Sequence, residues 1–500
     1  MQYQSTRDKS VRVASAYAIK TGLAADGGLY VPEQIPKLSL SEIAALAPMS
    51  YNDRAVNILS RFLTDFSEEE VTTCVNRAYS KEKFETVEIA PLFKLAQGVY
   101  FLELWHGPTC AFKDMALQIL PHLLKRSIEK TGETKEVVIL VATSGDTGKA
   151  ALEGFRDVEG TRIIVFYPAD GVSDVQKRQM VTQEGNNVDV AAVSGNFDDA
   201  QSGVKQIFTD NEYADVLARN NFLLSSANSI NWGRLVPQIV YYFSSYASML
   251  KNEEITLGEK VNFVVPTGNF GDILAAYYAK EMGLPVAKLI CASNENNVLT
   301  DFINTGVYDR NRSFKTTTSP SMDILISSNL ERFLFHVTGG DDARVSAWMK
   351  DLKDAGRYEV PELTKNKIKE IFWGGFCDDA ETFAQIDSVN REFGYVMDTH
   401  TAVAKGVYDK YVKETGDETK TVIVSTASPF KFSDSVLSAI QGEDATEGKD
   451  PFDLLDELAQ TTGLLIPQGL SGLREKPVIF TAVCEKTEMY DVVSHMLNLA

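Results

Sequence analysis

The sequence predicts an α/β protein with two domains built on parallel sheets and a mainly helical N-terminal domain. Short runs rich in β-branched residues recur from Val137 onward, and turn residues followed by a helical pattern separate them. Before residue 95 the pattern is helical and lacks such runs. With 500 residues, 44% of them hydrophobic, the chain can bury the cores of two or three domains.

The elements follow from these runs in chain order. Helices are expected at 40–46 and 67–79 in the N-terminal part. Strands are expected at 137–141, 161–167, 188–193, 222–225, 261–265, 288–291 and 421–424. We expect the domains to comprise residues 1–95 (N-terminal), 96–135 with 222–440 (large α/β), 136–221 (small α/β) and 441–500 (a peripheral C-terminal element).

The charge, the cysteines and the apolar runs of the sequence limit which partners and which cellular compartment are expected. The chain has 49 Lys and Arg against 69 Asp and Glu, so its formal charge of −20 opposes binding to nucleic acid or an anionic membrane. The five cysteines never stand in a CxxC spacing, which predicts neither a disulfide framework nor a metal site. The start lacks the apolar region of a signal peptide and no apolar run has membrane-spanning length, so we expect a cytoplasmic protein.

Two loops have the residue types of anion sites. ATSGDTG, at 142–148, follows the first expected strand and precedes a helix; hydroxyls and helix N-terminal N–H groups there can hold a carboxylate or phosphate, although an N-capping turn explains the same residues. PTGNFGD, at 266–272, follows the strand at 261–265 and suits a phosphate. It matches neither the nucleotide P-loop nor GxGxxG. Two such loops indicate two anionic groups.

Lys113 lies in WHGPTCAFKD, at 105–114. Gly107 and Pro108 set a turn, while Ala111 and Phe112 offer an apolar wall. An amine against such a wall is desolvated and its pKa is lowered, as a lysine that forms a Schiff base requires. From the residues alone, a solvated surface lysine remains the commoner alternative.

An ordered set of motifs resembles the threonine synthase family. Four motifs occur in the order typical of the family: HGPTCAFKD at 106–114, ATSGDTG at 142–148, NSINWGR at 228–234 and PTGNFGD at 266–272. Four further segments agree with the same family: GLAADGGLYVP at 22–32, the segment at 294–299, SPSMDI at 319–324 and DTHTAV at 398–403. The resemblance runs from about residue 20 to about residue 435. It implies a pyridoxal-phosphate (PLP) enzyme of fold type II, the tryptophan-synthase-β-like class.

The resemblance assigns the cofactor site. Lys113 would carry the cofactor as a Schiff base and act as the catalytic acid and base. The loop of Gly268, Asn269, Phe270 and Gly271, followed by Asp272, would wrap the cofactor phosphate. Asp146 would face the cofactor 3′-oxygen, although a capping role explains it equally well. Thr426 would meet the pyridine nitrogen; relatives carry His where this chain has Ser428, so Ser428 could share that role.

The resemblance also implies the reaction, conversion of O-phospho-L-homoserine and water to L-threonine and phosphate. The residues it places around the substrate are Thr143, Ser144, Thr147, Ser229, Asn231 and Arg234. Arg234 suits a fork-like phosphate contact, the alternative being an exposed arginine at a helix start. We interpret His106 and His400 as packed, hydrogen-bonded histidines rather than general bases.

Two other classes of function stay open at this point. A PLP-dependent threonine or serine dehydratase, or a phospho-lyase, would share Lys113 and the loop at 268–271. A non-catalytic binding protein that keeps the fold is the second alternative. The assembly is expected to be a monomer or a homodimer.

Overall fold

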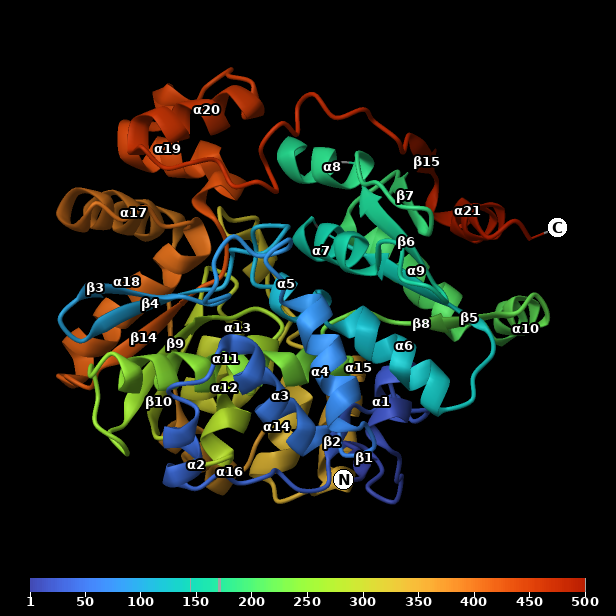
Figure 1. Ribbon diagram of the computed structural model, residues 1–500, viewed down its shortest axis with the longest axis horizontal. Helices are drawn as coiled ribbons and strands as arrows, with labels where there is room; N and C mark the ends of the chain where they lie inside the picture. The colour runs from blue at the N-terminus through green and yellow to red at the C-terminus, as the bar shows by residue number, and fades with distance from the viewer. Residues whose placement is uncertain (144, 170–171, 500) are drawn as a thin grey trace.

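The computed structural model describes residues 1–143, 145–169 and 172–499 and contains two separate main sheets covered by helices (Figure 1). This arrangement confirms the predicted α/β class with two parallel-sheet units. No helix among the described residues combines the length and the apolar character that a membrane crossing would need. All five cysteines are free and buried, as the absence of a CxxC spacing predicted.

The larger sheet has six strands. Their order is β13 (Phe372–Phe376), β10 (Val286–Ser293), β9 (Val261–Pro266), β14 (Thr421–Ser425), β4 (Val99–Glu103) and β3 (Leu92–Ala96). The pairs are parallel except β3–β4. Successive side chains of β9 point to opposite faces of the sheet. Phe263 and Val265 therefore pack in one hydrophobic core and Val264 packs in another.

Helices cover both faces of this sheet. The face of Phe263 packs with α11 (Trp232–Lys251) and α12 (Gly271–Glu281), and the face of Val264 packs with α17 (Asp379–Phe393), α18 (Thr399–Thr415) and α19 (Ser433–Gln441). A sheet buried on both faces explains the uninterrupted apolar runs by which its central strands were predicted.

The smaller sheet has five parallel strands. Their order is β15 (Ala482–Cys484), β7 (Val188–Val193), β6 (Thr161–Pro168), β5 (Glu136–Ala142) and β8 (Phe222–Ser225). One face packs with α6 (Leu120–Lys130), α7 (Asp146–Phe155) and α8 (Asp174–Val181), and the other with α9 (Phe197–Thr209), α10 (Asn211–Arg219) and α21 (Met489–Met496).

Two of the expected boundaries need correction. The strand Phe222–Ser225 was expected in the large domain, but it pairs with β5 and so belongs to the smaller sheet. The C-terminal segment was expected to be peripheral, but its strand β15 pairs with β7 and extends the same sheet. Both strands are short and lie at sheet edges, where little in the sequence indicates the partner. The division into domains otherwise stays a prediction.

The N-terminal part is mainly helical, as expected. It contains α1 (Ser15–Thr21), α2 (Leu40–Ala45), α3 (Tyr51–Phe62) and α4 (Glu68–Ala78). Ser39, Ser50 and Ser67 cap the last three helices by accepting hydrogen bonds from backbone N–H groups. A small antiparallel pair of β1 (Tyr3–Ser5) and β2 (Tyr30–Pro32) was not predicted.

The remaining elements connect or flank the sheets. They are α5 (Asp114–Leu117), α13 (Val298–Thr305), β11 (Val307–Asp309), η1 (Pro320–Met322), α14 (Leu330–Val337), α15 (Asp342–Ala355), β12 (Arg357–Glu359), α16 (Glu362–Ile371), η2 (Pro429–Phe432), η3 (Glu443–Ala445), α20 (Pro451–Thr462) and η4 (Lys486–Glu488).

Candidate active site

Lys113 lies in the turn that joins β4 to α5. Ala111 pairs with Ala427, and the N–H of Phe112 donates to the carbonyl of Thr426 at 2.8 Å, so this turn is fixed to the chain that leaves β14. The Lys113 amine is 4.8 Å from the centre of the Phe112 ring. Burial lowers the pKa of Lys113, an effect that Asp146 partly offsets. The predicted apolar wall is therefore present.

Asp146 is the first residue of α7 and points at the lysine. Its Oδ2 is 3.8 Å from Lys113 Nζ, and its Oδ1 accepts from Gln176 Nε2 at 2.9 Å. Gly145 rather than Asp146 occupies the cap position, and the hydroxyl of Thr143 accepts from the N–H of Gly148 in the first turn. Of the two interpretations of Asp146, the structure therefore disfavours the capping one.

A second lysine, Lys431 in η2, pairs with the same carboxylate. Its Nζ is 2.7 Å from Asp146 Oδ1 and also donates to the carbonyl of Thr109 at 3.1 Å, and its side chain is fully buried. Burial alone would raise the pKa of Asp146, but the charges of Lys431 and Lys113 hold that pKa below its ordinary value. Asp146 is thus an ionised carboxylate inside the protein. The sequence contained no signal for the role of Lys431.

The loop between β9 and α12 has a backbone that lies close to a neighbouring segment of the chain. Phe270 adopts a left-handed backbone with φ +64°, which turns the chain into the helix. A Cβ at Gly268 would lie 2.8 Å from the carbonyl oxygen of Ser321, so only glycine fits there. Gly271 begins α12, and the side chain of Asn269 is exposed.

Asp272 points away from this loop. Its Oδ1 accepts hydrogen bonds from the hydroxyls of Tyr241 and Tyr242, the second at 2.6 Å. Burial raises the pKa of Asp272 to about 6, because no cation pairs with it directly. Its other oxygen, Oδ2, has no hydrogen-bond partner among the described residues.

The loop at 142–148 is organised by Thr143. The Thr143 hydroxyl accepts from the N–H groups of Gly145 at 3.0 Å and Gly148 at 2.9 Å, so it fixes the turn. Thr147 is half-buried in the first turn of α7. Ser144, also predicted to contact the substrate, lies outside the described residues.

The segment NSINWGR begins α11. Asn231 caps the helix by accepting from Gly233 N at 2.8 Å, and its amide donates to the carbonyls of Ile19 and Ser226, so its side chain is fully occupied. Ser229 is half-buried in the preceding loop. Arg234 is 4% exposed, which excludes the interpretation of an exposed arginine.

Thr426 and Ser428 follow β14 and are both buried. The Ser428 hydroxyl accepts from Phe430 N at 3.3 Å and caps η2. Thr426 instead accepts from Phe112 N through its backbone carbonyl. This difference leaves the Thr426 hydroxyl available, but the choice of partner for the pyridine nitrogen stays a prediction.

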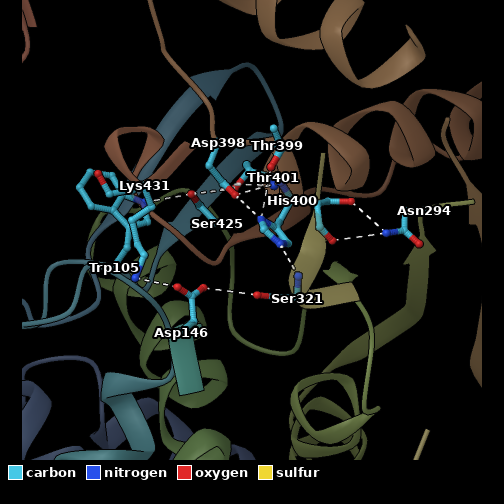
Figure 2. A network of polar contacts seen from close by, with 12 residues as sticks. Trp105, Asp146, Asn294, Ser321, Asp398, Thr399, His400, Thr401, Ser425 and Lys431 are labelled. Atoms are coloured by element: carbon cyan, nitrogen blue, oxygen red, sulfur yellow. Dashed lines mark hydrogen bonds and ion pairs between the residues drawn. The ribbon is translucent and has the colours of Figure 1, made fainter. Parts of the chain in front are cut away.

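Both histidines have carboxylate partners that sequence reasoning overlooked, although the partners lie two and three residues away. His400 Nδ1 is 2.8 Å from Asp398 Oδ2, and His106 Nε2 is 2.7 Å from Glu103. Figure 2 shows that His400 faces Ser321, a residue whose hydroxyl is in turn 3.3 Å from Asp146 Oδ2. Ser321 also contacts the Lys113 amine, at 3.3 Å.

Models of known protein families match most of this chain, in three successive segments. The family model "Threonine synthase N terminus" matches residues 2–79, "Pyridoxal-phosphate dependent enzyme" matches 84–358, and "Threonine synthase, C-terminal" matches 401–489. The threonine synthase of Saccharomyces cerevisiae is 36% identical over 469 residues, which is 88% of this chain and 89% of the yeast protein. The chain belongs to the threonine synthase family.

Two further members place the chain within this family. Threonine synthase-like 1 of Macaca fascicularis is 41% identical over 86% of this chain, which spans 58% of that relative's length. The crystal structure of PLP-bound threonine synthase from Brucella melitensis superimposes with a TM-score of 0.87 at 37% identity, and the match covers 99% of each chain. The fold is therefore fold type II, and the protein is a PLP-dependent enzyme of the threonine synthase family.

The residues present fit this cofactor. A phosphate needs hydrogen-bond donors, and Arg234 Nε and Asn329 Nδ2 are buried without partners among the described residues. Asn329 Oδ1 accepts from Arg332 at 2.6 Å, which directs the amide nitrogen toward Gly271, where it lies 3.4 Å from the position of a Cβ. Asn329 was not predicted, because no motif of the sequence analysis includes it.

Proposed function

We propose that this protein is a threonine synthase that converts O-phospho-L-homoserine and water to L-threonine and phosphate, with PLP bound to Lys113. The observation that supports this most directly is the largely buried Lys113 amine, which faces an ionised Asp146. Arg234 Nε and Asn329 Nδ2 are among the buried donors that have no partner in the described part of the chain. Relatives that are named threonine synthase match the chain over nearly its full length.

The donors would divide between the two phosphates. The N-terminus of α12, with the loop at 268–271 and Asn329, would hold the cofactor phosphate, because helix N-terminal N–H groups favour anions. Arg234 would bind the substrate phosphate with Ser229, and the loop at 142–148 would receive the substrate carboxylate. Burial lowers the pKa of Arg234 to about 10, so the guanidinium is still charged at neutral pH. A bound phosphate would supply the counter-charge it lacks.

Lys113 would carry out the proton transfers. Bound PLP supplies an electron sink for the negative charge that develops on the substrate. The Lys113 amine, once displaced by the substrate amine, would take the proton from Cα and pass it to the cofactor C4′, which frees the amine to take a second proton from Cβ as phosphate leaves from Cγ. It would then return one proton to Cγ and, as water adds at Cβ, one to Cα. Burial lowers the pKa of Lys113, which favours the unprotonated form that a general base needs.

A different reaction on the same scaffold is the alternative. A dehydratase or a phospho-lyase would use the same lysine, and the chain spans only 58% of threonine synthase-like 1, whose name does not state an activity. The buried Arg234 with a free Nε favours a substrate that bears phosphate. We also propose a cytoplasmic location and an assembly no larger than a dimer.

The test is Lys113→Ala together with product analysis. Lys113→Ala should lose the visible absorbance of the lysine-bound cofactor and all turnover, while Lys94→Ala, which removes an exposed lysine of β3, should keep both. Phosphohomoserine should yield phosphate and threonine in equal amounts. Release of 2-oxobutanoate instead would support the dehydratase, and normal activity of Lys113→Ala would contradict both assignments.

A further inference from the structure

Ser321 joins Lys113 to Asp146. The two charged groups are 3.8 Å apart, too far for a direct hydrogen bond, but the Ser321 hydroxyl is 3.3 Å from each. A carboxylate only accepts hydrogen bonds, so the Ser321 O–H donates to Asp146 Oδ2 and its oxygen accepts from the lysine. These bonds are long, as the contacts of catalytic groups often are before a substrate binds.

The backbone of Ser321 is held by His400. The Ser321 N–H donates to His400 Nε2 at 3.2 Å, and His400 Nδ1 lies 2.8 Å from Asp398 Oδ2. Since Nε2 accepts this hydrogen bond, the imidazole carries its proton on Nδ1, facing Asp398. His400 and Asp398 are 2% and 0% exposed. Despite the Ser–His–Asp arrangement of Figure 2, the histidine meets the serine backbone and cannot activate the hydroxyl.

The other side of the segment is also fixed. The Ser321 carbonyl lies against Gly268 of the loop before α12. Two residues further on, Asp323 Oδ1 accepts from Asn294 Nδ2 at 2.7 Å and from Thr317 Oγ1 at 2.8 Å. The backbone of Ser321 is thus held from three directions, so its hydroxyl can leave the lysine only by rotation of its own side chain.

We propose that Ser321 is a further catalytic residue, whose hydroxyl orients the Lys113 amine and connects it to Asp146, and that His400 is its positioning residue. The proposal rests on the proposed role of Lys113. When Lys113 is free of the cofactor, Ser321 would accept one of its N–H bonds and so direct its lone pair toward the substrate. No proton leaves Ser321 in this role.

The test compares three serine variants. Ser321→Ala removes the hydroxyl, Ser321→Thr keeps it, and Ser319→Ala removes a buried hydroxyl that bonds Asn294 in the same segment without contacting Lys113. Purified holoenzyme is titrated with pH while the visible absorbance of the lysine-bound cofactor is followed, and kcat and KM are measured. The charged or titratable groups that act on Lys113 include Asp114 (α5), Asp146 (α7), Arg234 (α11), Asp272 (α12) and Lys431 (η2), all unchanged in these variants.

We expect Ser321→Ala to lower kcat about 10- to 100-fold, with a smaller change in KM, and to shift the midpoint of the absorbance titration. Ser321→Thr should restore both, and Ser319→Ala should resemble the wild type. If Ser321→Ala does not fold, Ser321→Cys should shift the same quantities in the same direction, because a thiol is a weak hydrogen-bond partner.

The positioning role of His400 has its own pair of variants. His400→Gln keeps an acceptor for the Ser321 N–H, whereas His400→Leu does not, so only the leucine variant should reproduce the titration shift of Ser321→Ala. A Ser321→Ala enzyme with the midpoint and kcat of Ser319→Ala would overturn the proposal. A wild-type protein without visible absorbance after PLP loading would instead overturn the proposed role of Lys113.

Discussion

Asp146 and Asp272 show how the partner of a buried carboxyl decides its charge. Asp146 pairs with Lys431 and contacts Lys113, so its pKa is held low and it stays ionised. Asp272 accepts only from tyrosine hydroxyls, and burial raises its pKa to about 6. One carboxyl is thus a permanent charge beside the lysine, while the other titrates just below neutral pH.

Asp272 should therefore make stability depend on pH. An aspartate in the unfolded chain releases its proton near pH 3.9, so between about pH 4 and 6 the folded state binds more protons than the unfolded state. The free energy of unfolding should fall as pH rises through this window, by up to about 1.4 kcal/mol per pH unit. Asp272→Asn keeps an acceptor for both tyrosines and should flatten this slope.

Urea unfolding at several pH values between 4 and 7 measures this slope. Asp215→Asn, which changes an exposed carboxyl of α10, is the control and should keep the wild-type dependence. An Asp272→Asn protein with the same slope as the control would show that Asp272 does not titrate in this range.

At this scale the sequence predicted residues that lie within motifs. Arg234 is buried, the side chain of Lys113 is 11% exposed, and the lysine faces its predicted apolar wall. Lys431, Ser321 and Asn329 were not assigned roles, because their functions depend on contacts made across the fold rather than with sequence neighbours. A lysine in a helical turn is ordinarily solvated, and only the fold shows that Lys431 is buried beside Asp146.

At the scale of elements, the sequence predicted most strands of the two main sheets, but it missed the five-residue strands β3 and β4 as well as the three-residue and glycine-containing strands. All seven expected strands are present. The strand β13 was missed because FWGGF has two glycines in five residues, which weaken a strand pattern, and β1, β2 and β15 have three residues each. The partners of such strands are set by tertiary packing.

Helix packing near Lys113 depends on Gly154 of α7. A Cβ at Gly154 would overlap the carbonyl oxygen of Leu117, the last residue of the helix that follows Lys113. Alanine normally stabilises a helix by about 1 kcal/mol relative to glycine, but here it should push two backbones apart. We expect Gly154→Ala to lower the free energy of unfolding by about 1–3 kcal/mol and to weaken PLP binding.

The matched control is Gly203→Ala in α9. The Cβ there would meet the flexible side chain of Met489 rather than backbone, so this variant should be near wild-type in urea unfolding. Equal losses in both variants would show that Gly154 has no special role in positioning α5.

At the scale of the whole molecule, the C-terminal segment connects the two sheets. Figure 1 shows it running from α20, beside α19, across to β15 and α21. On its way Gln468 N donates to Glu85 at 2.7 Å, and a Cβ at Gly469 would overlap the carbonyl of Pro108, close in sequence to Lys113. No sequence pattern predicted the course of this segment, because it has few regular elements.

Arg178 of α8 should hold this segment in place. Its guanidinium donates to the carbonyls of Leu473 and Arg474, and to that of Lys476 at 2.8 Å. Arg178→Ala should leave these carbonyls unpaired and raise the rate of proteolytic cleavage between residues 463 and 480 several-fold. Lys177→Ala, which changes an exposed neighbour on the same helix, should not. Limited proteolysis with mass spectrometry distinguishes the two outcomes.

The pairing of β15 with β7 also has a consequence for biosynthesis. Strands β5 to β8 are synthesised long before residues 482–484. More than half of the chain is therefore still to be translated when β7 is complete, and until β15 is synthesised the edge of β7 has no β15 to pair with. An unpaired strand edge is a template for aggregation. A nascent chain of this protein therefore passes through a long interval in which chaperones, rather than its own fold, must protect one edge of the smaller sheet.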